Sequence, residues 1–226
     1  MHDVQIRPEI VNRVMERRKR FHIFDRLDPR ASALIVIDMQ NTFCAPGAPA
    51  EVPASRGICA NINRLAARLR QMGGKVVWVT HAITASGSKS DWSGFFDVFV
   101  ADAIRQRTIE SMHPSGEGQK IWHELQPQSE DIYVVKNRYS ALISGASQLE
   151  RILRSRGIEN ILIAGTKTNV CCESTARDGM MLDFRVVMVS DCNAALSDRE
   201  HLATLETIIQ QFGDVLTADE VINILH

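Results

Sequence analysis

The sequence predicts an α/β protein with a single doubly wound domain, in which helices flank a six-stranded parallel sheet. Several short runs are apolar and β-branched without polar alternation, as in strands that are buried on both faces of a parallel sheet. These runs alternate with segments of helical spacing, a pattern that indicates right-handed crossovers between parallel strands. With 226 residues, 45% of them hydrophobic, the chain is long enough for one substantial core.

Residues 1–30 are rich in charge and are predicted to form an N-terminal arm ahead of a folded domain over residues 31–226. A weakly amphipathic helix is expected from roughly Pro8 to Phe21. An arm of this kind packs along the surface of its own domain or across a subunit boundary. Its basic run, Arg17 to Arg20, is interpreted as a solvated helix face or a subunit contact.

The first predicted strand, Ala33 to Asp38, is an unbroken apolar run that ends in a carboxylate. Residues 41–54 follow as a loop rich in proline and alanine, and two glycines close the helix expected from Ile58 to Met72. A second strand is predicted over Lys75 to Thr80. Residues 81–118 are the least regular part of the chain, and a long insertion here is expected to cover or shape a pocket.

The second half of the chain repeats the alternation of strand and helix. One strand ends at Lys136, and another ends at Gly165, shortly before a segment with two cysteines. Thr217 is suited to cap the last helix. The predicted strands are residues 131–136, 161–165, 184–191 and 215–217, and the predicted helices are residues 146–156, 170–181, 199–212 and 218–225.

The composition limits which kinds of partner the protein is expected to bind and in which cellular compartment it is expected to work. The net charge is −1, so nothing favours nucleic acid or an anionic membrane as a partner. No apolar run approaches the roughly 18 residues of a membrane span, and the first residues lack the apolar region of a secretory signal. The five cysteines form no C-x-x-C pair. We therefore expect reduced thiols in a cytoplasmic protein.

Cys171 lies where a reactive thiol is expected. The segment from Ile161 to Gly165 is typical of a strand, and a tight turn then leads into a helix, which puts Cys171 at or near the helix N-terminus. Unpaired backbone N–H groups and the helix dipole favour negative charge there. They are expected to lower the pKa of the thiol toward neutrality and to receive the oxyanion formed when the thiolate attacks a carbonyl.

Asp38 and Lys136 stand at the C-terminal ends of predicted strands, and Cys171 stands just past the end of another. These ends share one edge of a parallel sheet, so three side chains far apart in sequence can meet there. A carboxylate beside a thiol can take its proton, and an ammonium keeps the carboxylate ionised and stabilises the thiolate. The protonated Asp38 can then pass its proton to a leaving amine.

The chain from Ser32 onward resembles the isochorismatase-like cysteine hydrolase superfamily, and most closely its ureidoacrylate amidohydrolases and related hydrolases of ureido and amide compounds. The matching segments are Ala33-Leu-Ile-Val-Ile-Asp38-Met-Gln-Asn41, Lys136-Asn-Arg-Tyr-Ser140 and Gly165-Thr-Lys-Thr-Asn-Val-Cys171-Cys-Glu-Ser-Thr-Ala-Arg-Asp178. The resemblance implies a six-stranded parallel sheet and a catalytic triad of Asp38, Lys136 and Cys171. It also implies a cis peptide within residues 165–167, which turns the backbone N–H of Lys167 toward the oxyanion beside that of Cys171.

Two departures from the family pattern narrow this expectation. Lys167 replaces a small apolar residue before Thr-Asn-Val-Cys, and its side chain either contacts the substrate or points to solvent. The loop after Asp38 lacks the Asp-x-His pattern of the metal-binding nicotinamidases. We therefore expect no metal and no cofactor, and nicotinamide is a less favoured substrate.

Five further side chains are candidates for contact with the substrate: Asn41, His81, Trp92, Arg138 and Tyr139. Asn41 and Tyr139 closely follow triad positions, and His81 comes just past the second strand. Arg138 could bind a carboxylate, and Trp92 could wall an apolar pocket with the two nearby phenylalanines. Each of the five has a structural alternative, as a core, exposed or interface residue.

The residues and the resemblance together predict a metal-independent amidohydrolase that cleaves a linear amide or ureido C–N bond through a thioester and releases ammonia. Carbamoyl amino acids, biuret-type compounds and maleamate-like amides are alternative substrates. A thiol-based redox or regulatory protein is the alternative from a different class, although a redox sensor needs neither Asp38 nor Lys136. The expected partner is a small molecule, and we expect a homodimer or homotetramer.

Overall fold

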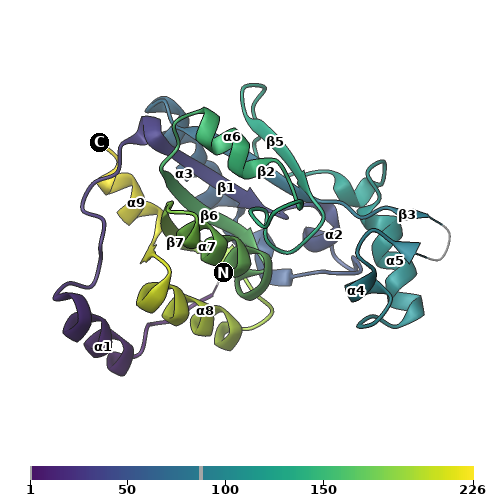
Figure 1. Cartoon of the computed structure of the whole chain (residues 1–226), viewed down its shortest axis with the longest axis horizontal. Coiled ribbons are helices and arrows are strands. Elements are labelled where there is room, and N and C mark those ends of the chain that lie inside the picture. Colours follow the sequence, from purple (N-terminus) through teal and green to yellow (C-terminus); the bar gives the residue numbers. More distant parts are fainter. Residues whose placement is uncertain (1, 87–88) are drawn as a thin grey trace.

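The computed structural model describes residues 2–86 and 89–226. Its centre is a six-stranded sheet in the order β5-β2-β1-β6-β7-β8, in which every neighbouring pair of strands is parallel. The predicted fold class is therefore confirmed (Figure 1). The strands are β1 Ser32–Ile37, β2 Lys75–His81, β5 Ile132–Lys136, β6 Asn160–Thr166, β7 Arg185–Ala194 and β8 Asp214–Leu216.

Helices cover both faces of this sheet (Figure 1). On one face lie α3 Cys59–Gln71 and α9 Ala218–Ile224, and their apolar side chains form one buried cluster with the sheet. On the other face lie α6 Leu149–Ser155, α7 Glu173–Met181 and α8 Asp198–Gln211, which form a second buried cluster with the sheet.

The sequence of β1 lacks polar alternation because both of its faces are covered. Leu34 and Val36 pack into the cluster with α3 and α9, whereas Ala33, Ile35 and Ile37 pack into the cluster with α6, α7 and α8. Complete burial of one leucine or isoleucine side chain stabilises a fold by about 1.5–3 kcal/mol. The apolar run is therefore a requirement of this central position in the sheet.

Most predicted elements are present, with boundaries shifted by a few residues. The helix predicted to reach Phe21 ends earlier, because Lys19 takes the left-handed conformation (φ 61°) and closes α1 Pro8–Arg18. Residues 41–54, predicted as a loop, begin with the four-residue helix α2 Asn41–Cys44.

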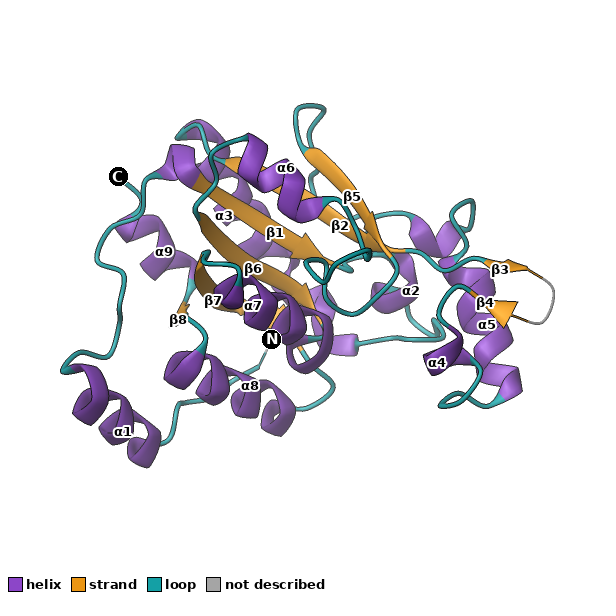
Figure 2. Cartoon of the chain, viewed as in Figure 1, coloured by secondary structure: helices purple, strands orange, loops and turns teal. Residues whose placement is uncertain are grey.

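Residues 81–118 contain more regular structure than their sequence suggests. The antiparallel strands β3 Ala85–Ser86 and β4 Lys89–Ser90 are followed by α4 Ser93–Phe96, α5 Asp102–Met112 and the short 3₁₀ turn η3 Glu117–Gln119. Figure 2 shows α4 and α5 on the side toward which the strands of the central sheet point. This segment therefore lies beside the carboxyl edge of the sheet.

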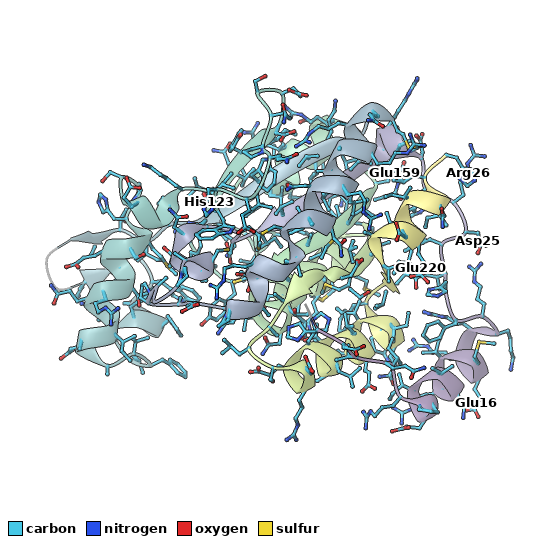
Figure 3. All side chains as sticks on the ribbon, turned by 180° about the vertical axis from the view of Figure 1, so that it is seen from behind. Glu16, Asp25, Arg26, His123, Glu159 and Glu220 are labelled. Atoms are coloured by element: carbon cyan, nitrogen blue, oxygen red, sulfur yellow. The ribbon has the colours of Figure 1, made fainter. Side chains whose placement is uncertain are left out.

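Charged side chains of both signs lie on the outside of the molecule. Figure 3 shows Glu16, Asp25, Arg26, Glu159 and Glu220 at the end away from α4 and α5, and all five are exposed. Within residues 2–86 and 89–226, no helix is both long enough and apolar enough to cross a membrane.

The N-terminal arm is attached to α8 and β8. Apolar residues of α1 pack into the second buried cluster. Arg7 holds the carboxylate of Glu206 with two parallel hydrogen bonds, at 2.8 Å from Nε and 2.6 Å from Nη2. Further along the arm, His22 Nδ1 lies 3.0 Å from Oδ1 of Asp214, a residue that is buried in β8. These polar contacts, with further hydrogen bonds from Arg13, Arg17 and Arg18 to α8, fix the course of the arm over the domain.

Replacing His22 by glutamine is expected to lower the melting temperature at about pH 5.5 and to have little effect at about pH 8.5. The hydrogen bond to Asp214 raises the pKa of His22 above its ordinary value of 6.5. A group whose pKa rises on folding adds stability below its unfolded pKa, and this stability is lost as the pH rises through the folded pKa. Thermal unfolding of both forms at the two pH values measures the difference. An equal loss at both pH values would contradict this role of the imidazolium.

Candidate active site

Four polar side chains come together where strands of the sheet end. Asp38 directly follows β1, His81 ends β2, Lys136 ends β5, and Cys171 lies in the turn after β6. The strands β5, β2, β1 and β6 are neighbours, so their ends bring these residues to one edge of the sheet (Figure 2). Their exposed fractions are 0% for Asp38, 2% for His81, 1% for Lys136 and 4% for Cys171. The carboxyl edge of the sheet thus holds a buried cluster of titratable groups.

Asp38 and Lys136 form a buried ion pair. Lys136 Nζ lies 2.8 Å from Asp38 Oδ2 and also donates to the carbonyl oxygen of Arg138 at 3.1 Å. Burial acts to lower the pKa of Lys136, but the charges of Asp38 and Cys171 and the hydrogen bonds to them together outweigh burial, and the pKa is raised. The second carboxylate oxygen, Oδ1, is buried and has no hydrogen-bond partner among the described residues. Asp38 therefore has one oxygen held by an ammonium and one open oxygen that can accept a proton.

The sulfur of Cys171 lies within 4.8 Å of a carboxylate oxygen of Asp38 and of a ring nitrogen of His81. Burial and the Asp38 carboxylate raise the pKa of this thiol, although Lys136 acts in the opposite direction. The prediction of a pKa lowered by a helix N-terminus is therefore wrong. Cys171 lies in the buried π-helical turn η4 Thr168–Cys172. Loss of water around a thiolate there raises the pKa by more than a helix N-terminus lowers it. The resting sulfur is protonated, so a base must take its proton during any attack on a carbonyl.

The turn before Cys171 has the backbone form that the family resemblance implies. The peptide bond between Thr166 and Lys167 is cis, and the N–H of Lys167 donates to no backbone oxygen of the described residues. Gly165 precedes this bond with φ 116°, and a Cβ at that position would overlap the backbone oxygen of Ile37. Only glycine permits this close approach of β6 to β1.

Asp38, His81 and Cys171 form the donor set that could hold a metal ion, since one ligand atom from each lies within 4.8 Å of the others. His81 Nε2, like Asp38 Oδ1, has no hydrogen-bond partner within the described part of the chain. Burial lowers the pKa of His81 well below its ordinary value, so the imidazole is neutral. The ammonium of Lys136, 2.8 Å from Asp38, opposes a divalent cation, because two positive centres would share one buried carboxylate. The absence of a metal from the working site stays a prediction.

A cavity of about 250 Å³ opens beside this cluster. Cys171, His81 and Lys167 line it, together with Trp92 and Tyr139. The rings of Trp92 and Tyr139 meet edge to face, with their centroids 4.6 Å apart. The structure thus brings three predicted substrate contacts, His81, Trp92 and Tyr139, to the cavity beside the cysteine.

The other two candidates lie elsewhere. Asn41 begins α2, and its side-chain amide donates to the carbonyl oxygen of Glu117 at 2.9 Å, which ties α2 to η3. The guanidinium of Arg138 donates to the carbonyl oxygens of Asn137 at 2.7 Å and Asp91 at 3.1 Å. Neither Asn41 nor Arg138 is among the described residues that line the cavity. Asn41 is thus engaged by η3, whereas the Arg138 guanidinium lies 5.2 Å from the centroid of the Trp92 ring, which lines the cavity. Contact of either residue with a substrate stays a prediction.

One wall of the cavity is absent from the sequence prediction. Ile104, Thr108 and Met112 line the cavity from α5. Their spacing of four residues is the signal of a helix face, and it could have been found. The glycines, serines and aromatic residues of 81–118 obscure this signal in the sequence.

One family matches most of the chain. The isochorismatase domain covers residues 32–220, so the chain belongs to the isochorismatase family. Ureidoacrylate amidohydrolase RutB from Klebsiella pneumoniae (strain 342) is 32% identical over 202 residues, which cover 83% of this chain and 85% of the relative. Among solved structures, a cysteine hydrolase from Pseudomonas syringae pv. phaseolicola 1448A is similar with a TM-score of 0.80 and 30% identity, over 92% of this chain and 98% of that one. Nicotinamidase PncA from Bacillus subtilis is similar with a TM-score of 0.69 and 25% identity, over 82% and 99% of the two chains. The predicted family is therefore confirmed.

Proposed function

We propose that this protein is an amidohydrolase that cleaves a linear amide or ureido C–N bond, with Cys171 as the nucleophile. One observation carries the proposal: a buried thiol lies within 4.8 Å of a carboxylate that is itself paired with an ammonium at 2.8 Å. Membership of the isochorismatase family and similarity to a ureidoacrylate amidohydrolase support the type of bond.

In the first half of the proposed reaction, Asp38 takes the thiol proton while the sulfur of Cys171 attacks the carbonyl carbon. Burial raises the pKa of Asp38 against the opposing charge of Lys136, which makes this carboxylate a stronger base than an exposed aspartate. Lys136 stays protonated and balances the charge while the proton moves. The backbone N–H groups of Lys167 and Cys171 receive the oxyanion.

In the second half, the tetrahedral intermediate collapses to a thioester, and the proton on Asp38 passes to the leaving nitrogen, which departs as ammonia when the amide is primary. Asp38 then takes a proton from the water molecule that attacks the thioester. Collapse of this second intermediate releases the acid and returns the proton to the sulfur of Cys171. The cycle consumes one water molecule and leaves the three side chains unchanged.

The proposal also places the reaction in the cytoplasm and expects a homodimer or homotetramer. All five cysteines are buried free thiols, as suits a reducing compartment. Light scattering after size-exclusion chromatography measures the assembly.

Ammonia release from a panel of linear amides and ureido compounds tests the proposed activity. The panel contains ureidoacrylate, carbamoyl amino acids, biuret and maleamate, with nicotinamide as the disfavoured member. We expect turnover of at least one linear compound and, after an acid quench, an acyl group on Cys171 in the mass spectrum. Hydrolysis without any acyl group on Cys171 under single-turnover conditions would contradict the thioester route.

A further inference from the structure

We propose that the cavity selects substrates that carry an uncharged apolar group, such as an aromatic ring or a branched hydrocarbon, near the amide or ureido carbonyl. This inference rests on the proposed function and names a substrate class distinct from short acids such as ureidoacrylate. Three features of the cavity beside Cys171 support the inference: the residues that line it, the packing of its aromatic wall, and the positions of the charged side chains around it.

The lining of the cavity divides by origin into polar and apolar parts. The polar groups next to the sulfur, His81 and Lys167, come from the end of β2 and from the turn after β6. Two further polar side chains line the cavity: Tyr139 follows β5, and Thr108 of α5 donates its hydroxyl to the carbonyl oxygen of Ile104. The apolar groups come largely from α2, α4 and α5, and include Phe43, Phe95, Phe96, Ile104 and Met112. A substrate that presents its carbonyl to Cys171 therefore directs the rest of its body toward an apolar wall, where burial of hydrocarbon is favourable.

Contacts among its own rings hold this wall in place. Trp92 packs on Phe95 with ring centroids 5.0 Å apart, and Phe95 meets Phe96 edge to face at 5.0 Å. Phe96 is buried in a third apolar cluster, in which Phe43 of α2 and Met112 of α5 also lie. A preformed wall binds an apolar group without first having to order its own side chains.

A carboxylate against this wall would lack a partner. Lys136 is already paired with Asp38. The guanidinium of Arg138 lies behind the wall, 5.2 Å from the centroid of the Trp92 ring, and donates to two backbone oxygens. Lys167 is the one cation among the described residues of the lining, and it belongs to the turn that carries Cys171 rather than to α4 or α5. Because burial of an unpaired carboxylate is strongly unfavourable, the wall disfavours acids.

The size of the cavity limits the apolar group to a single ring. An apolar cavity of ~150 Å³ is large enough to bind benzene. The volume of about 250 Å³ therefore leaves room for one ring together with the reacting amide.

Two matched pairs of compounds test the inference. 3-Phenylpropanamide and succinamate share one primary amide on the same two-carbon chain and differ in a terminal phenyl or carboxylate group. Benzylurea and ureidoacetate form the corresponding ureido pair. We expect kcat/KM to be about tenfold or more higher for the phenyl member of each pair. Equal values, or a preference for the acid, would overturn the inference and leave the proposed function standing.

Binding to the Cys171→Ala variant tests the inference without turnover. This variant cannot form a thioester, so calorimetry reports binding of the intact compound. The phenyl member should bind about tenfold more tightly than the acid, and equal or weaker binding would overturn the inference. Phenyl binding without turnover of any compound by the wild-type protein would count against the proposed function alone.

A matched pair of variants locates the preference at the wall. Phe95→Ala should lower the ratio of phenyl to carboxylate kcat/KM about tenfold, which corresponds to about 1.4 kcal/mol. Phe99→Ala is the control, because Phe99 is 80% exposed and stacks on Phe95 without lining the cavity. Its ratio should stay at the wild-type value. An unchanged ratio in Phe95→Ala, or an equal drop in both variants, would remove the aromatic wall as the source of specificity.

Discussion

Replacement of Cys171 by alanine is expected to lower kcat/KM about 1,000-fold or more, with little change in the fold. The loss follows from the chemistry, because no thioester can form without the sulfur. The cavity and its lining remain, so the variant should still bind substrate and the loss should fall on kcat more than on KM. Ammonia release with the best compound of the panel measures activity, and circular dichroism checks the fold.

Cys172→Ala is the matched control for this experiment. Cys172 is the next residue in the same turn and is fully buried, and its sulfur lies 3.9 Å from the carbonyl oxygen of Ala164. It is not among the described residues of the cavity lining. Both variants lose one buried sulfur, so their losses of stability should be similar, whereas only Cys171→Ala should lose activity. Substantial activity in Cys171→Ala, or equal losses in both, would refute the nucleophile assignment.

The sheet and the meeting of its strand ends could be predicted because the signals are local and repeated. The run through β1 must be apolar on both faces, and Thr217 forms the expected cap, with Glu220 completing a capping box at the start of α9. Once the strands are known to be parallel, their carboxyl ends share one edge, and the closeness of Asp38, Lys136 and Cys171 follows.

The electrostatics and the walls of the site could not be predicted in this way. The raised pKa of Cys171 depends on burial by elements distant in sequence, which outweighs the local effect of a helix terminus. The wall from α4 and α5 depends on how residues 81–118 fold over the edge of the sheet. The direction of the Arg138 side chain depends on backbone acceptors that no sequence pattern marks. Local sequence patterns therefore predict where the backbone of a residue lies better than they predict what surrounds its side chain.

Removal of either partner of the Asp38–Lys136 pair is expected to lower the free energy of unfolding by about 3–5 kcal/mol and to abolish turnover. Asp38→Asn leaves a buried ammonium, and Lys136→Met leaves a buried carboxylate, each without the partner that lies 2.8 Å away in the wild-type protein. Denaturant unfolding measures stability, and ammonia release measures activity. Arg70→Met is the control, since it breaks a different ion pair, with Asp131 at 2.6 Å, before the amino end of β5. It should lower stability and keep activity.

The double variant Asp38→Asn/Lys136→Met separates the structural role of this pair from its chemical role. It leaves no uncompensated buried charge, so its loss of stability should be smaller than the sum of the two single losses. Activity should nevertheless stay absent, because the carboxylate proposed to take the thiol proton is gone and burial still raises the pKa of the thiol. If activity returned together with stability, the ion pair would serve the fold alone. The proton of Cys171 would then have to pass to another group, such as neutral His81, which has a ring nitrogen within 4.8 Å of the sulfur.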